Sequence, residues 1–452
     1  MRPESSHLRD SRLYGQNWAV EPVRSWFTES RRIASWLEIL AAIAQAQADL
    51  GAVPRAAADD IERACTSGPF DLDWIAGRSH ATGHSTTGLL EAVGDLVDTD
   101  HARYVGLGVT VQDISDTWTA LTIKLTAECL DRDLRELLRI LSRGALAHRH
   151  TVMLGRTHGQ PGVPITFGFK QAQWAEELTR GLERLDEGRP RWETAQLGGS
   201  AGSLAYWGAD APALMAAFGR RIGLAVPALP WASARDCVAE FGVFTALLGA
   251  SLAKIGNEIY QLQRPEIGEL GEQWTGEQIG SVTMPQKRNP ERSEQLVTLG
   301  RLLRSHALVL LEGAVVEHER DGRAWKAEWV ALPDVCCAVT RASSLCAELL
   351  ASLEVHADRM HANAGDRGGV AMSERAVRML EPHLGRPGAY AAVRQAAAGT
   401  QAGRFAHLGD ALAESGIPAG VDLSPLRDPR SAVASAEALV QAWSQAWDLR
   451  GI

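Results

Sequence analysis

Four short segments of the chain combine hydroxyl, amide, imidazole and cationic side chains that could bind or act on a small anionic molecule. They are "TGHSTTG" at 82–88, "GVTVQDISDT" at 108–117, "GRTHGQPGVP" at 155–164 and "GSVTMPQKRNP" at 280–290. In the last segment, Pro285 and Pro290 each remove a backbone donor and fix φ, which predicts a loop rather than a helix or a strand. This loop therefore presents a serine hydroxyl, a lysine and an asparagine amide together.

Taken one at a time, several of these residues have ordinary explanations. His84 is as compatible with a surface histidine or a neighbour of a helix cap as with a functional residue, and Asp113 is as compatible with a charge that complements a helix dipole as with a functional one. His148 and His150 are two residues apart on an expected helix, so they point apart and do not indicate a metal site. The segment "WKAEW" at 325–329 is interpreted as packing rather than as an aromatic cage.

Most of the remaining sequence shows apolar residues at helical spacing, which predicts an all-α protein. There is no alternating strand segment and no β-hairpin signal. Helices of this length cannot bury their apolar stripes within one small globule, so we expect a bundle that continues across subunits. Long helices are expected at 31–50, 113–147, 168–187, 234–263, 290–318 and 333–354.

The composition is that of a soluble globular protein large enough for two or three domains. The chain has 452 residues, of which 45% are hydrophobic and 22% are charged. Its net charge of −9 disfavours nucleic acid as a partner but still allows a small anionic substrate. No window approaches the ~20 uninterrupted apolar residues of a membrane span, and the N-terminus lacks the apolar core of a signal peptide. We therefore expect a cytoplasmic protein, with six reduced core cysteines that show no metal-site spacing.

In combination and in this order, the four segments resemble the signature regions of the fumarase/aspartase superfamily, which includes adenylosuccinate lyase, argininosuccinate lyase and carboxymuconate cycloisomerase. The loop at 280–290 matches the signature G-S-S-x-M-P-x-K-x-N-P except for Val282. "GRTHGQP" is similar to the second region and "GVTVQDISDT" to the first. Further similar stretches are "WLEILAAIAQAQADLGAVP", "LGGSAGSLA", "EHERDGRAWKAEWVALPD" and "GGVAMSERAV".

The resemblance implies a three-domain, all-α fold. An N-terminal helical domain is expected at 1–111, a central long-helix bundle at 112–354 and a C-terminal helical domain at 355–452. It also implies a homotetramer of D2 symmetry in which the first, second and third signature regions at each active site come from different subunits. The expected partner is a small dicarboxylate substrate, with no metal and no organic cofactor.

The same resemblance implies roles for individual residues. Ser281 would be the general base, with Lys287 and the loop backbone stabilising its alkoxide. His158 would protonate the leaving group, and Glu294 would pair with His158 and fix its tautomer. Valine replaces the usual serine at 111 and at 282, so the carboxylate contacts or the loop geometry must differ there. The implied substrate-binding residues are His84, Ser85, Thr110, Gln112, Asp113, Arg156, Thr157, Gln160, Met284 and Asn289.

The segment after "HERD" separates the branches of the superfamily. Adenylosuccinate lyases have a Ser-Ser-x-Glu-Arg segment there that grips a phosphate, whereas this chain has Trp325 and Trp329, which disfavours a phosphorylated purine. The expected reaction is therefore β-elimination from an N-substituted succinate, such as nitrosuccinate, to give fumarate. The alternatives are 3-carboxy-cis,cis-muconate cycloisomerase and adenylosuccinate lyase. A non-catalytic structural protein is disfavoured because the four implied catalytic residues are all present.

Overall fold

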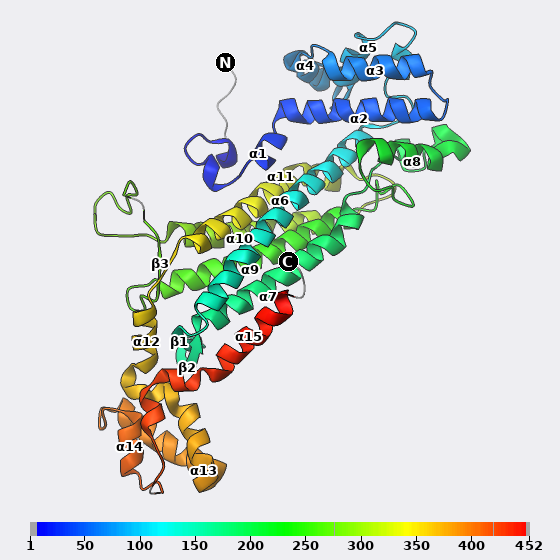
Figure 1. Cartoon of the computed structure of the whole chain (residues 1–452). Coiled ribbons are helices and arrows are strands. Elements are labelled where there is room, and N and C mark those ends of the chain that lie inside the picture. Colours follow the sequence, from blue (N-terminus) through cyan, green and yellow to red (C-terminus); the bar gives the residue numbers. More distant parts are fainter. Residues whose placement is uncertain (1–6, 275, 419, 449–452) are drawn as a thin grey trace. The chain divides into compact units, whose positions relative to one another are not determined.

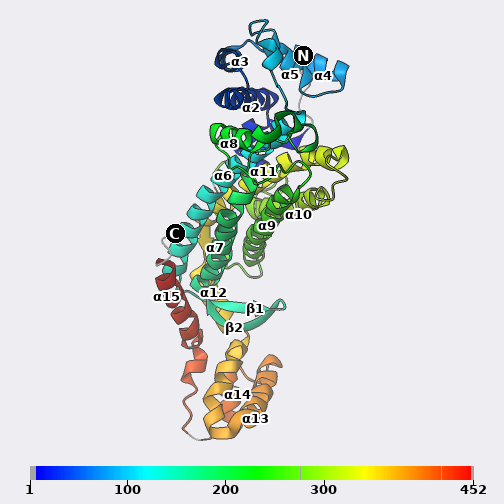
Figure 2. The same ribbon diagram turned by 90° about the vertical axis from the view of Figure 1, so that its right-hand side faces the viewer.

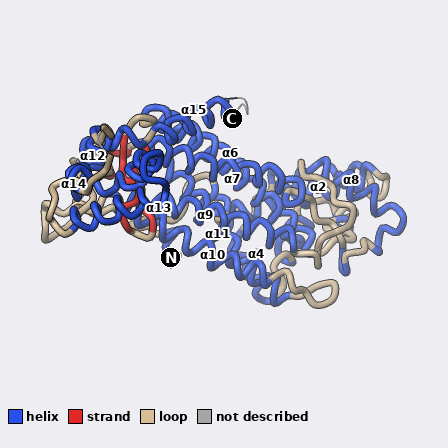
Figure 3. The backbone as a smooth tube through the Cα atoms, turned by 90° about the horizontal axis from the view of Figure 1, so that it is seen from below, coloured by secondary structure: helices blue, strands red, loops and turns tan. Residues whose placement is uncertain are grey.

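The computed structural model describes residues 7–274, 276–418 and 420–448. These residues form a mostly helical protein, as predicted, with strands confined to a small part of the traced chain (Figure 3). The strands are β1 (Val152–Thr157), β2 (Gln160–Thr166), β3 (Leu270–Glu272) and β4 (Leu353–Val355). The α-helices are α1 (Val23–Trp26), α2 (Glu29–Asp49), α3 (Arg55–Ser67), α4 (Leu72–Thr82), α5 (Thr87–Gly94), α6 (Val111–Ala147), α7 (Phe167–Trp192), α8 (Ala211–Ile222), α9 (Asp236–Leu262), α10 (Glu291–Glu312), α11 (Gly322–Ala351), α12 (Ala357–Gly365), α13 (Ser373–Gln401), α14 (Leu408–Glu414) and α15 (Ala434–Asp448).

The long helices expected from apolar periodicity are present, with three wrong boundaries, of which one is the end of α7 at Trp192 rather than at 187. Helices α6, α7, α9, α10 and α11 lie side by side as a bundle (Figures 1 and 2). Helix α11 begins eleven residues before the predicted start at 333 because Asp321 accepts the backbone N–H of Arg323 at 2.9 Å and caps the helix, which then continues through Pro333. Helix α10 ends at Glu312 rather than at 318, since Gly313 follows it and breaks the helical pattern.

The expectation that the chain contains no β-hairpin was wrong. Strands β1 and β2 pair antiparallel, with Thr157 opposite Gln160. The two residues between them, His158 and Gly159, have φ values of 53° and 71°, as the tight turns of hairpins require. The sequence signal was weak because His-Gly is not a common hairpin dipeptide and β2 contains two prolines. In a two-stranded sheet both strands are edge strands, so the absence of a backbone N–H at each proline of β2 is tolerated.

The contacts within the chain define two compact units, each made of three segments. The first comprises residues 1–133, 181–250 and 298–343, and the second comprises residues 134–180, 251–297 and 344–452. The five bundle helices contribute residues to both units. In the second unit, a separate apolar core of α13 and α14 includes Leu380, Val393, Leu408 and Leu412. The division into three domains at 111 and 354 stays a prediction.

Two further features concern expectations about membranes and thiols. Helices α9 and α11 are long and apolar enough to cross a membrane, but 67% and 72% of their most apolar stretches are buried in the protein. Such burial is characteristic of core helices. The six cysteines are free thiols, and all except Cys237 are buried, in agreement with reduced core thiols.

Candidate active site

The first predicted segment lies in the first unit, where it leads into helix α6. Asp113 is fully buried, and its carboxylate accepts the backbone N–H groups of Thr110 at 3.0 Å, Gly198 at 2.6 Å and Gly199 at 3.0 Å. These bonds tie the start of α6 to the loop that contains "LGGS". Burial raises the pKa of Asp113 to about 6, and the three N–H donors partly oppose that rise. Asp113 therefore anchors two backbone segments to each other.

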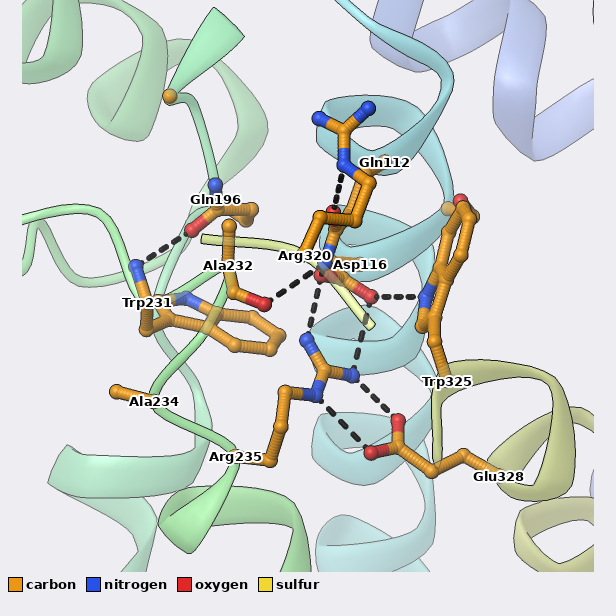
Figure 4. Close-up of polar contacts among 12 residues, drawn as sticks. Gln112, Asp116, Gln196, Trp231, Ala232, Ala234, Arg235, Arg320, Trp325 and Glu328 are labelled. Carbon is orange, nitrogen blue, oxygen red and sulfur yellow. Dashed lines mark hydrogen bonds and ion pairs between the residues drawn. The ribbon is translucent and has the colours of Figure 1, made fainter. Parts of the chain in front are cut away.

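Gln112 is also buried, and it links the α6 start to a residue that the sequence analysis did not single out. Its amide nitrogen donates to the carbonyl of Ala232 at 2.8 Å and to Asp116 at 3.0 Å. Its amide oxygen accepts Nε of Arg320 at 2.7 Å (Figure 4). Arg320 is an exposed residue, and its Nη1 lies 3.3 Å from Oγ1 of Thr110. A cation and a hydroxyl thus lie together at this end of α6.

Behind Gln112, a buried cluster of charges joins α6, α11 and the residue that precedes α9 in the first unit (Figure 4). Arg235 is 2% exposed, and it donates to Asp116 at 2.6 Å and to Glu328 at 3.0 Å. Although burial alone would lower the pKa of Arg235, the two carboxylates raise it above its usual value, whereas burial raises the pKa of Glu328. Trp325 donates its indole N–H to Asp116 at 2.9 Å. The cluster fixes α6 against α11 and the start of α9.

The tryptophans of the segment 325–329 do pack, as interpreted from the sequence. Trp325 is buried, and its ring meets that of Trp329 edge to face with the centroids 4.8 Å apart. Trp329 is 42% exposed. His84 and Ser85 are exposed in the turn between α4 and α5, and Nδ1 of His84 lies 3.4 Å from Oγ1 of Thr86.

The second predicted segment forms the β1–β2 hairpin of the second unit. His158 stands at its tip in the left-handed region, and Thr157, His158 and Gln160 are all exposed. A non-glycine residue with positive φ is uncommon, although histidine tolerates that region better than most residues. Arg156 points elsewhere: it donates to both oxygens of the buried Glu269, at 2.6 Å and 3.0 Å. In this structure Arg156 therefore secures the hairpin.

The third predicted segment is a loop of the second unit that is held mainly by its own hydrogen bonds. Oγ of Ser281 accepts the backbone N–H of Met284 at 3.0 Å. Asn289 donates to the carbonyl of Gly280 at 2.7 Å. A Cβ on Gly280 would lie 2.0 Å from the carbonyl oxygen of Lys287, so only glycine allows this closure of the loop. The side chains of Met284 and Lys287 are exposed.

The loop leads into helix α10, and a buried carboxylate fixes that helix start. Glu272 accepts the hydroxyl of Ser293 at 2.6 Å and the backbone N–H groups of Arg292 and Ser293 at 3.1 Å and 3.0 Å. It thus satisfies donors that a helix start leaves unpaired. Glu294 lies on the same first turn and is exposed.

The predicted site residues thus form four groups, one of which is His84 and Ser85 in the turn between α4 and α5. Thr110, Gln112 and Asp113 lie together in the first unit, while the residues around His158 and around Ser281 form two groups in the second unit. Sequence reasoning missed Arg320, Arg235 and its two carboxylates. Arg320 had a visible signal because it belongs to the quoted stretch "EHERDG". The buried cluster had none, since its members are 93 and 119 residues apart.

One group of acidic and imidazole side chains in the described part of the chain has the spacing of a metal site. It consists of Asp60, Asp98 and His101. The carboxylate of Asp60 already accepts His101 at 2.8 Å and the backbone N–H of Asp98 at 2.9 Å, and it also pairs with Arg63. A cationic partner and internal hydrogen bonds explain this group without an ion.

Both the sequence and the fold of this chain are similar to those of known lyases and a lactonizing enzyme. A family described as "Lyase" matches residues 16–302. N-acetyl-S-(2-succino)cysteine lyase from Dickeya dadantii is 35% identical over 85% of this chain and 85% of its own length. Nitrosuccinate lyase from Streptomyces davaonensis is 34% identical over 97% of this chain and 96% of its own length. The structure of 3-carboxy-cis,cis-muconate lactonizing enzyme from Pseudomonas putida matches with a TM-score of 0.88 and 32% identity, over 96% of this chain and 98% of that one.

Proposed function

Because the chain belongs to the lyase family of the fumarase/aspartase superfamily, we propose that it catalyses anti β-elimination from a 2-substituted succinate with a nitrogen leaving group. A base removes a proton from the carbon beside one carboxylate. The bond from the neighbouring carbon to nitrogen then breaks, and its electron pair leaves with the nitrogen group. The products are fumarate and the protonated leaving group, so no oxidant or reductant is required.

The observation that carries this proposal is the hydrogen bond from the backbone N–H of Met284 to Oγ of Ser281, at 3.0 Å. A serine is too weak a base in water, and it becomes one only where its ionised form is stabilised. An N–H group directed at the oxygen favours the alkoxide over the hydroxyl. Lys287 adds a positive charge to the same loop. Ser281 is therefore the proposed base.

The other residues are assigned to the charges that develop during the reaction. The intermediate after proton removal carries extra negative charge on a carboxylate, and fixed donors stabilise such charge best. Thr110, Arg320 and Asn289 can supply these donors. His158, on the exposed tip of its hairpin, is the proposed acid for the leaving group, and Glu294 is its proposed partner.

The nitrogen leaving group is supported by the likeness to nitrosuccinate lyase and by the aromatic pair Trp325 and Trp329. These rings replace the phosphate-binding segment of adenylosuccinate lyases, so a phosphorylated purine is the less favoured leaving group. Because the Dickeya relative is named for a succinylated sulfur compound, a thiol is a related possibility for the same chemistry.

A second candidate function is cycloisomerisation of 3-carboxy-cis,cis-muconate. The observation that favours it is the fold likeness to the Pseudomonas putida enzyme over nearly the whole of both chains. In that reaction, the same base and acid would serve the addition of a carboxylate across a double bond.

The test is a continuous ultraviolet assay over a panel of substrates, which follows fumarate formation from the succinates and loss of the conjugated diene of the muconate. The panel contains nitrosuccinate, N-alkyl and N-aryl aspartates, S-succinylated thiols, adenylosuccinate and 3-carboxy-cis,cis-muconate. Fumarate from the nitrogen-substituted succinates, at kcat/KM values above those of the thiols and of adenylosuccinate, is the expected result. Turnover of the muconate alone would overturn the proposal in favour of the second candidate.

The proposal includes a cytoplasmic homotetramer with active sites shared between subunits. It rests on the superfamily resemblance and on helices of about 30 residues, roughly 45 Å long by the α-helical rise, whose apolar stripes exceed what one chain can cover. Light scattering in solution gives the subunit number directly. A monomer would contradict shared sites.

A further inference from the structure

A cavity lies in the first unit, beside the segments that the proposed function uses. It has about 560 Å³ of empty space including its open mouth. Trp36 of α2, Trp118 of α6 and Trp329 of α11 form much of its wall, and Arg32 projects from α2 as the cationic group. A neighbouring cavity shares Arg32, Trp36 and Ser85 with it. The two spaces therefore meet at an arginine surrounded by aromatic rings.

Three nitrogen donors on residues that line this cavity lack acceptors within the described part of the chain. Within the described residues, Nε of Arg32 and the indole N–H groups of Trp36 and Trp118 are buried without a hydrogen-bond partner. Trp36 and Trp118 are each 7% exposed. The guanidinium of Arg32 stacks 4.6 Å from the centre of the Trp118 ring, and burial lowers the pKa of Arg32. Buried donors in proteins are normally paired, so the residues that line this cavity carry more N–H donors than the protein itself pairs.

The two nearby carboxylates, Glu328 and Glu29, do not form an ion pair with Arg32. Glu328 also lines the cavity, but both of its oxygens accept from Arg235. Glu29, one turn before Arg32 on α2, attracts the guanidinium only at longer range and is itself exposed. Arg32 is partly buried, and an arginine removed from water is stabilised by a paired anion, as the fully buried Arg235 is by its two carboxylates. Among the described residues, Arg32 is therefore a cation on the cavity wall for which no carboxylate lies within ion-pair distance.

The residues that line the cavity include neighbours of two segments assigned to the reaction. Ser115, which lines it, lies one turn after Val111 and donates to the Val111 carbonyl at 2.7 Å. Ser85, which also lines it, follows His84 directly. We propose that this cavity receives the leaving group of the substrate, and that it selects a leaving group with an apolar or aromatic body and a carboxylate of its own. This inference rests on the proposed function.

Binding can be tested without turnover, in the full-length protein. Calorimetry compares 3-phenylpropanoate with 3-phenylpropanol, which differ in the carboxylate. We expect the acid to bind at least about 30-fold more tightly, because the alcohol leaves the guanidinium unpaired. Arg32→Met should remove that preference. The matched control is Arg31→Met, because Arg31 also stacks on a tryptophan, at 4.5 Å from Trp26, but does not line the cavity.

Kinetics then tests selection by the enzyme. Two substrates share the succinyl group and the leaving nitrogen: 2-[(4-carboxybenzyl)amino]succinate and 2-(benzylamino)succinate. The wild-type enzyme should prefer the first by about 30-fold or more in kcat/KM, and Arg32→Met should reduce that ratio to within about threefold. Arg32→Lys should fall between these values, since it keeps the charge but not the planar fork.

Each outcome decides one claim. If neither substrate nor any other succinate releases fumarate, the proposed function fails. If fumarate forms but the two substrates react equally, or if Arg32→Met keeps the preference, the inference fails and the proposed function stands. Equal binding of chloride or phosphate would mean an adventitious ion only and would overturn the inference.

Discussion

The start of helix α6 and the 280–290 loop are both assigned to the same reaction, yet the protein holds them in opposite ways. Gln112 and Asp113 are buried, and residues more than 80 positions away in the sequence hold them. In the loop, Met284 and Lys287 are exposed, and Ser281 is held by a bond to a residue three positions away. The first region is fixed by tertiary structure, whereas the second is fixed by its own short-range geometry.

This difference matches the tasks proposed for the two regions. A site that stabilises developing charge works best when its dipoles are already in place, and buried hydrogen bonds on a helix supply that rigidity. A base must approach and leave the reacting carbon, and loops on rigid scaffolds commonly supply such groups. We therefore expect changes in the loop to affect catalysis without stability, and changes around α6 to affect stability as well.

The largest expected effect is in the loop. Ser281→Ala should lower kcat by at least about 1,000-fold, a rise of about 4 kcal/mol in the barrier, because no other group takes the proton from carbon. The melting temperature should stay unchanged, since Ser281 makes only local bonds. Steady-state kinetics and a thermal melt measure both quantities.

The matched control for Ser281→Ala is Thr283→Val, which removes a hydroxyl 3.4 Å from Oγ of Ser281 in the same loop. It should retain kcat within about tenfold. If Ser281→Ala kept more than about a tenth of the wild-type kcat, less than ~1.4 kcal/mol of barrier would depend on it. Ser281 would then not be the base.

The second largest effect concerns shared active sites. Ser281→Ala and His158→Asn proteins, each inactive, should regain activity when they are dissociated, mixed and reassembled. If each site takes Ser281 and His158 from different chains, random mixing leaves about a quarter of the sites with both residues intact. The assay is fumarate release after reassembly, compared with each variant reassembled alone. No recovery despite demonstrated subunit exchange would mean that one chain supplies both residues.

The third prediction concerns the buried charges beside the start of α6. Arg235→Met should lower the free energy of unfolding by about 3–5 kcal/mol, because Asp116 and Glu328 would remain as buried carboxylates without their cation. Denaturant unfolding measures the change. The loop counterpart is Lys287→Met, whose side chain is exposed, and it should change the free energy of unfolding by less than about 0.5 kcal/mol. Equal effects of the two substitutions would contradict the contrast between the regions.

The sequence predicted the helical fold well because apolar periodicity is a local property. The stripes that define α2, α6, α7 and α9 can be read without knowledge of their packing partners. The β1–β2 hairpin was missed because its turn depends on positive φ values at His158 and Gly159. The dipeptide His-Gly does not by itself predict such a turn. The start of α11 was missed because Pro333 looked like a boundary.

The candidate site divides in the same way. Loop residues such as Ser281 and Lys287 were identified because their types and spacing resemble a known signature. Arg235, Asp116 and Glu328 were not, because a charged side chain in an apolar stripe reveals its partners only after folding brings distant residues together. Their burial is a tertiary property. Arg320 lies between these cases, since its segment was recognised but its contact with Gln112 was not.

The smallest expected effect is a pH dependence of stability that arises at Asp113. Burial raises its folded-state pKa to about 6, above the ordinary value of 3.8. Between these pH values the folded protein binds more protons than the unfolded chain does. The contribution of Asp113 to stability is therefore fully present below pH ~4 and is lost as the pH rises to about 6, by up to about 3 kcal/mol. Denaturant unfolding at several pH values measures this slope.

The Asp113→Asn variant isolates that slope, because asparagine has no proton to release. Its amide keeps one oxygen for the N–H groups of Thr110, Gly198 and Gly199 but turns an NH₂ group toward the others, so the variant should be less stable at every pH. What identifies Asp113 is the loss of the decline between pH 4 and 6. An unchanged decline would assign the titration to another carboxyl. Because the bond from the Thr110 N–H to Asp113 positions Thr110, the variant should also lower kcat. A change at the start of α6 should thus affect both stability and catalysis, whereas the loop variants should affect catalysis alone.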